Sequence, residues 1–171
     1  MKQSTIPVGF IMFSIALLYT DVTSSSSYGP GVKQCAFRSV GSLSQNLDSG
    51  QIQTCDFQKV FSNSALRVTY HGDMRLVGTS SGDCRRWYIT INGQECSSPA
   101  PIDAIIYVNK INGINIHRPG TLDGFCKNIP AGRVTVGLSV GRCSGYSNVG
   151  DAATCYNSVC RLIIEEYPSM Q

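Results

Sequence analysis

The sequence lacks the patterns that mark helical bundles, membrane spans and common metal sites. No segment carries a convincing helical period over about eleven residues. The longest apolar run, Phe10 to Tyr19, has about ten residues, where a spanning helix needs about 20. There is no CxxC or HExxH motif, and His71 and His117 have no cysteine pair near them at zinc spacing. We therefore expect no membrane insertion, no metal and no cofactor.

The sequence also contains no recognisable catalytic motif. A nucleophile needs a base within hydrogen-bond reach, oriented by a third group. His71 begins an expected His-Gly turn and His117 precedes Arg118-Pro119, and neither lies in a G-x-S-x-G or similar context. We predict that the protein is not an enzyme. Turn chemistry alone explains the aspartates beside glycines, which could otherwise suggest calcium: Asp73, Asp83, Asp123 and Asp151.

The charge and composition point to a compact extracellular domain. The net charge is only +3, with 15% charged residues and 17 glycines in 171 residues. Such a balance is unlike that of nucleic-acid-binding proteins and suits a β-rich domain better than a disordered chain. Nucleic acid is therefore not an expected partner.

The N-terminus has the layout of a secretory signal peptide. Lys2 precedes the apolar run, and small residues follow at Val22, Thr23 and Ser24. We predict a signal peptide at residues 1–24, a flexible leader at 25–34, and a single disulfide-stabilised domain at 35–171. The expected location is the extracellular space or matrix.

All eight cysteines lie beyond the predicted cleavage point. In an oxidising compartment they allow up to four bridges, with about 105 possible connectivities. These disulfide candidates are Cys35, Cys55, Cys84, Cys96, Cys126, Cys143, Cys155 and Cys160.

Short strands separated by turn signals predict an all-β fold, an antiparallel jelly-roll sandwich of about ten strands. In GRVTVGLSVGRC, for example, Val134, Val136, Leu138 and Val140 share one face. Glu165 and Glu166 are interpreted as a solvated strand end. The expected strands are 51–60, 65–71, 74–77, 85–92, 102–109, 114–118, 132–142 and 156–166.

Two of these strands are apolar on both faces, IDAIIYV from Ile102 and VCRLII from Val159. Such strands require cover on both sides. The second face is covered either by a neighbouring subunit or by a loop, and we expect oligomerisation.

CRRWYITINGQEC, from Cys84 to Cys96, holds the only tryptophan. Trp87, Ile89 and Ile91 share a face that we expect to be core, and Asn92-Gly93 predicts a two-residue hairpin turn. In that register Cys84 and Cys96 are not cross-strand partners. The possible partner-binding surface is Arg85, Arg86 and Tyr88. The alternative is that the arginines are a solvated edge, and in either case we expect their replacement by alanine to leave folding nearly unchanged.

Several ordered motifs together resemble the C-terminal domain of the collagen triple helix repeat-containing protein family. The resemblance runs from about Cys35 to Tyr167 and rests on SNSALRV, RWYITINGQEC, PIDAIIY, INIHR, the Gly-Asp-Ala at 150–152 and NSVCRLIIEE. It implies a fold similar to complement globular heads and tumour necrosis factor, which typically trimerises. It also implies secreted proteins that restrain collagen matrix deposition, promote cell migration and help Wnt ligands engage Frizzled-type receptors.

The resemblance therefore makes Wnt ligands, Frizzled-type receptors or matrix proteins the expected partners of a homotrimer. The alternative is a self-assembling structural component of the matrix without receptor activity. The chain departs from the family pattern in having no collagen repeat beyond Gly29-Pro30-Gly31 and no glycosylation sequon. Cys155 and Cys160 are extra, and they pair with each other only if the chain between them bends, because a straight strand would separate them by roughly 16 Å.

Overall fold

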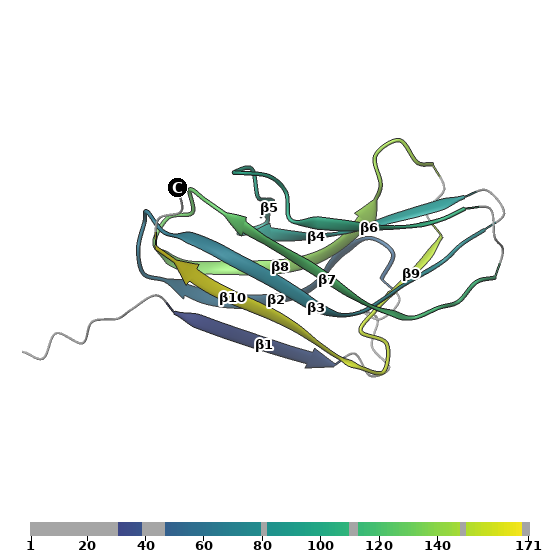
Figure 1. Ribbon diagram of the computed structural model, residues 1–171, viewed down its shortest axis with the longest axis horizontal. Coiled ribbons are helices and arrows are strands. Elements are labelled where there is room, and N and C mark those ends of the chain that lie inside the picture. Colours follow the sequence, from purple (N-terminus) through teal and green to yellow (C-terminus); the bar gives the residue numbers. More distant parts are fainter. Residues whose placement is uncertain (1–30, 39–46, 80–81, 110–112, 148–149, 169–171) are drawn as a thin grey trace, which may run out of the picture.

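The computed structural model describes residues 31–38, 47–79, 82–109, 113–147 and 150–168 (Figure 1). The predicted signal peptide, residues 1–24, lies outside these described residues. The described part of the chain consists of ten strands with no helix, so it contains no helix long and apolar enough to cross a membrane.

The strands form two antiparallel sheets packed as a sandwich (Figure 1). The first sheet has the order β1-β10-β3-β7, with β9 paired to the end of β3. The second has the order β2-β8-β4-β5, with β6 paired to β4. The predicted all-β jelly-roll sandwich is confirmed. The strand bounds are β1 (Val32–Arg38), β2 (Gly50–Lys59), β3 (Ala65–Val77), β4 (Asp83–Ile91), β5 (Gln94–Glu95), β6 (Asp103–Val108), β7 (Arg118–Cys126), β8 (Gly132–Arg142), β9 (Asp151–Thr154) and β10 (Val159–Tyr167).

The core lies between the sheets and is built from alternate residues of each strand. The four apolar residues of β8 named above are all buried there. Trp87 on β4 is fully buried, as its position on the strand predicts, and its indole N–H donates to Thr154 Oγ1 at 2.8 Å. That bond satisfies the one polar atom the tryptophan brings into the core.

The predicted Asn92-Gly93 hairpin is present. Thr90 pairs with Glu95 and Ile91 with Gln94, and both turn residues have positive φ, 51° for Asn92 and 79° for Gly93. β5 ends after these two pairs. Nearer the start of β4 the neighbouring strand is β6, so Cys84 lies opposite Tyr107. Cys84 is neither the cross-strand nor the disulfide partner of Cys96.

Three strands were not expected from the sequence, namely β1, β7 and β9. β1 begins at Val32, so the last residues of the predicted leader are in a strand. The segment predicted at 114–118 is a strand only from Arg118 on, where β7 begins. The expected turn at His71-Gly72 is wrong, because β3 continues unbroken from Ala65 to Val77 by pairing with β10, β7 and then β9.

Four disulfides join all eight cysteines. Cys35–Cys55 and Cys96–Cys126 each connect one sheet to the other, and Cys84–Cys143 closes a longer loop within the second. Cys155 bonds to Cys160, with a Cα–Cα distance of 5.6 Å. The chain between them can bend because Cys155 and Asn157 have positive φ, 62° and 48°, and β10 starts only at Val159.

Candidate partner-binding surface

Arg85 does not belong to the surface predicted for it. Its position in β4 has the same parity as Trp87, so its side chain lies on the inner side, and the residue is only 5% exposed. The guanidinium donates to the carbonyl of Gly150 at 2.9 Å and to that of Asp48, and it forms an ion pair with the Asp48 carboxylate at 3.2 Å. The expectation that Arg85 is exposed is therefore wrong.

Arg86 and Tyr88 do lie on the outer side of β4. The Arg86 guanidinium is 4.8 Å from the centre of the Tyr88 ring and donates to both oxygens of Glu95 and to Asp103. The hydrogen bonds with Glu95 and Asp103 raise the pKa of Arg86, and the same contact with Arg86 lowers the pKa of Glu95. Two carboxylates thus more than offset the single charge of Arg86, which makes this face unsuited to an anionic ligand.

Apolar side chains lie next to this pair on β6. Ile105 is the cross-strand neighbour of Arg86. Ile105 and Tyr107 are 60% and 46% exposed. The ring of Tyr146, from the loop after β8, lies 5.5 Å from that of Tyr107. We call these residues the β6 face: Arg86, Tyr88, Ile105, Tyr107 and Tyr146. The second apolar face of IDAIIYV predicted the β6 part, whereas Tyr146 lies in a loop and carries no periodic signal.

The β6 face borders a hollow between the free edges of the two sheets. Two adjoining cavities, of about 250 and 360 Å³, share Met74, Ile106, Tyr107 and Arg118 in their walls. The lining is mostly aliphatic. An exposed apolar strand beside an apolar hollow is the kind of surface that proteins bury against partners.

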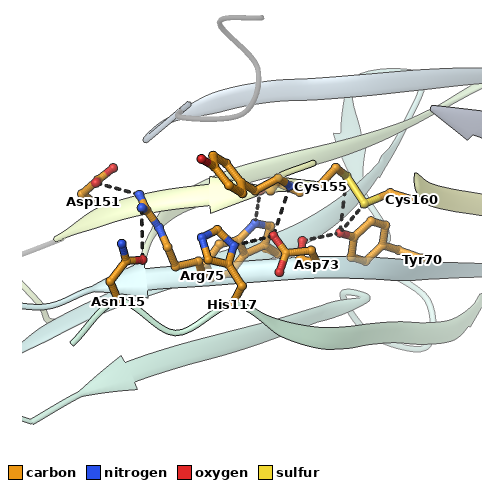
Figure 2. A network of polar contacts seen from close by, with 11 residues as sticks. Tyr70, Asp73, Arg75, Asn115, His117, Asp151, Cys155 and Cys160 are labelled. Carbon is orange, nitrogen blue, oxygen red and sulfur yellow. Dashed lines mark hydrogen bonds and ion pairs between the residues drawn. A yellow bond between two sulfur atoms is a disulfide. The ribbon is translucent and has the colours of Figure 1, made fainter. Parts of the chain in front are cut away.

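A separate polar network surrounds the Cys155–Cys160 disulfide (Figure 2). The Asp73 carboxylate lies 2.8 Å from His117 Nδ1 and accepts from the backbone N–H of Tyr156 at 3.1 Å. Tyr70 donates to the carbonyl of Asp73 at 2.9 Å, and burial raises its pKa. This network fastens the disulfide loop to β3.

The four aspartates considered for calcium lie apart, and each has its own side-chain partner. Asp73 binds His117, Asp83 binds Thr79, Asp123 binds Arg67 and Asp151 binds Arg75. The hydrogen bond from Arg67 lowers the pKa of Asp123. Among the described residues, no group of three or more histidine, cysteine or acidic side chains is arranged to hold a metal ion.

The antiparallel sandwich and its four disulfides define a class, the disulfide-stabilised all-β domains typical of extracellular proteins. Residues 27–164 match the family described as CTHRC1, C-terminal domain, so the chain belongs to the collagen triple helix repeat-containing protein family. The resemblance found in the sequence is confirmed. The family places the chain among extracellular-matrix-related proteins, and it is not known as a family of enzymes.

Solved structures offer only remote likenesses. Dimeric latent PorU from Porphyromonas gingivalis is 9% identical with a TM-score of 0.43, and the match covers 81% of this chain and 13% of that one. The VP2 subviral particle of infectious bursal disease virus is 12% identical with a TM-score of 0.27, and the match covers 96% of this chain and 46% of that one. Neither likeness extends to function.

Proposed function

We propose that this protein is secreted into the extracellular matrix and acts by binding other proteins. In this proposal it forms a homotrimer and helps Wnt ligands engage Frizzled-type receptors, and through them it influences planar polarity, cell migration and collagen deposition. Family membership supports the extracellular setting, and the four disulfides fit it.

The β6 face is the observation on which the binding function rests. Ile105 and Tyr107 leave a large part of their apolar surface in water, a cost that burial in an interface removes. The cores of protein interfaces are enriched in tyrosine and arginine. Tyr88, Tyr107 and Arg86 match that enrichment.

Ile105→Asp tests assembly. We expect the wild-type protein to have the mass of a trimer and the variant to have the mass of a monomer, because a carboxylate in the contact would be desolvated without a partner. Native mass spectrometry measures both. Val32→Asp is the matched control, since Val32 is 69% exposed on β1 of the other sheet and its replacement should leave the trimer intact.

Surface-binding measurements with Wnt ligands and Frizzled-type ectodomains test the activity. We expect the wild-type protein to bind and the Ile105→Asp variant to lose most of that binding. If the wild-type protein binds neither class, the receptor function is wrong. If its mass grows with concentration without reaching a discrete trimer, the protein is instead a self-assembling matrix component.

A further inference from the structure

A second surface, on the opposite sheet, has the features of an anion site. A cavity of about 280 Å³ lies where the middle of β3 meets the start of β7 and the start of β10. Its walls include His71, His117, Arg118, Ser158 and Arg161. This cavity contains none of the five residues of the β6 face, although Arg118 and Pro119 also line the hollow beside that face.

The cationic side chains of this cavity are brought together by strand register. Arg161 on β10 pairs directly with His71 on β3, so both side chains stand next to each other on the outer face of the first sheet. On either side of them along the same row lie Ala36 and Thr121, which carry no charge. Two side chains that can donate hydrogen bonds thus stand side by side, with no acidic residue in the same cross-strand row.

Within the part of the chain that the structure describes, Arg118 and Arg161 form no ion pair with a carboxylate. The arginines that do so are Arg67, Arg75, Arg85, Arg86 and Arg133. The acidic wall residue of this cavity, Asp73, is already engaged by His117 and by the N–H of Tyr156 (Figure 2). The carboxylate pairs with neither arginine, and its single charge offsets at most one of their two.

Ser158 supplies an independent observation. Its Oγ is buried and has no hydrogen-bond partner, although the residue lines the cavity. A buried hydroxyl without a partner is costly, and native proteins rarely keep one without a role. A ligand oxygen in the cavity would accept hydrogen bonds from the N–H groups of Arg161 and Arg118, and a rotation of the Ser158 side chain would bring its hydroxyl to the same ligand.

We infer that this cavity binds a sulfate group of a sulfated polysaccharide. The two arginines can only donate hydrogen bonds, and His71 and Ser158 can donate as well, so the ligand that fits best offers several acceptor oxygens and negative charge. Arg38 lies opposite Val159, another wall residue, and extends the basic strip along the sheet edge, which favours an extended chain over a single small ion. Sulfated polysaccharides supply such chains in the extracellular setting that the family indicates.

Binding of a sulfated heparin octasaccharide to the full-length protein tests the inference. We expect Arg161→Gln to weaken the affinity at least about ten-fold and Ser158→Ala to weaken it several-fold, while thermal unfolding without ligand stays unchanged or improves. Arg133→Gln is the control, because it removes the same charge from a side chain that is 76% exposed on the other sheet. Its affinity should stay within about two-fold of wild type.

Three results would overturn this site. Equal losses in the Arg161 and Arg133 variants would mean diffuse attraction to a positive protein. Undiminished binding of the desulfated octasaccharide would exclude sulfate recognition, and inorganic phosphate competing at equal concentration would indicate a site for small free anions. Because Ile105→Asp leaves this cavity intact, octasaccharide binding by that variant separates this site from the proposed trimer and receptor function.

Discussion

At the scale of single residues, Arg85 and Arg86 are neighbours in β4 with opposite roles. Arg85 is buried and holds two segments distant in sequence, around Asp48 and Gly150, against the end of the sandwich. Arg86 lies outside and pairs with two carboxylates that are more than a third exposed. Hydrogen bonds from a buried cation contribute more to stability than exposed ion pairs, which solvent screens.

We expect Arg85→Ala to lower the free energy of unfolding by about 2 kcal/mol, because two backbone carbonyls lose a charged donor. Arg86→Ala should lower it by about 0.5 kcal/mol. Urea unfolding of the two single variants measures this difference. Equal midpoints for both variants would show that the contacts of Arg85 add no more to stability than the exposed ion pairs of Arg86.

The alternation that correctly placed Trp87 in the core also places Arg85 on that side. An arginine can lie there only if its N–H groups find acceptors. Those acceptors come from residues 48 and 150, far away in the chain, and no local pattern indicates them. The outer position of Arg86 and Tyr88, by contrast, follows from strand period alone.

At the scale of strands, the end of β10 also depends on contacts with residues distant in sequence, which no local pattern indicates. Glu166 was interpreted as solvated, yet it shares the inner side of β10 with Leu162 and Ile164 and is buried. Its carboxylate accepts the N–H groups of Val60 and Phe61, each at 2.8 Å, and the hydroxyl of Ser64. Glu166 therefore fastens the turn between β2 and β3 to the last strand.

These contacts predict a pH-dependent effect of Glu166→Gln. Burial alone would raise the pKa of Glu166, but the hydrogen bonds from Ser64, Phe61 and Val60 bring it below its ordinary value. A carboxyl group with a lowered pKa in the folded state adds stability above its unfolded pKa, and that stability is lost as the pH falls through the folded pKa.

We therefore expect Glu166→Gln to cost about 2 kcal/mol at pH 7, and the difference from wild type to shrink as the pH falls below about 4.3. Urea unfolding of both proteins across this pH range measures the difference. A gap that stays constant down to pH 3 would show that the charge of Glu166 is irrelevant.

The strands with clear alternation or a continuous apolar run were predictable, and those with neither were not. β8 and β4 alternate over most of their length and were found near their true ends, as was β6, a nearly continuous apolar run. β7 has the sequence RPGTLDGFC, whose proline and two glycines indicate turns. It is a strand because it lies at an edge of the first sheet and pairs with β3, a tertiary contact that overrides local preference.

Gly72 shows why β3 can continue through a segment that resembles a turn. A Cβ at this position would lie 2.1 Å from Cys160 Sγ and 2.7 Å from the Tyr70 hydroxyl. The glycine is required by the close approach of the Cys155–Cys160 disulfide, and no turn is formed. Nothing in the local sequence distinguishes these two uses of glycine, because the disulfide approaches from about 90 residues further along the chain.

At the scale of the whole molecule, the disulfides differ in how much chain they close. The separations are 59 residues for Cys84–Cys143, 30 for Cys96–Cys126, 20 for Cys35–Cys55 and 5 for Cys155–Cys160. A disulfide stabilises mainly by reducing the entropy of the unfolded chain, and the effect grows with the length of the closed loop. The three bridges that close longer loops should thus contribute more to the free energy of unfolding than Cys155–Cys160, the pair that is extra to the family pattern.

Replacing each disulfide in turn by two alanines tests this order. Loop closure predicts losses of about 4 kcal/mol for Cys84–Cys143 and about 2 kcal/mol for Cys155–Cys160, with the two bridges that join the sheets in between. Urea midpoints of the four variants give the ranking, provided that the unfolding slopes agree. If Cys155–Cys160 proves the most costly to remove, its packing against Tyr70 and Gly72 outweighs loop entropy, and the network around Asp73 is then the main support of this end of the sandwich.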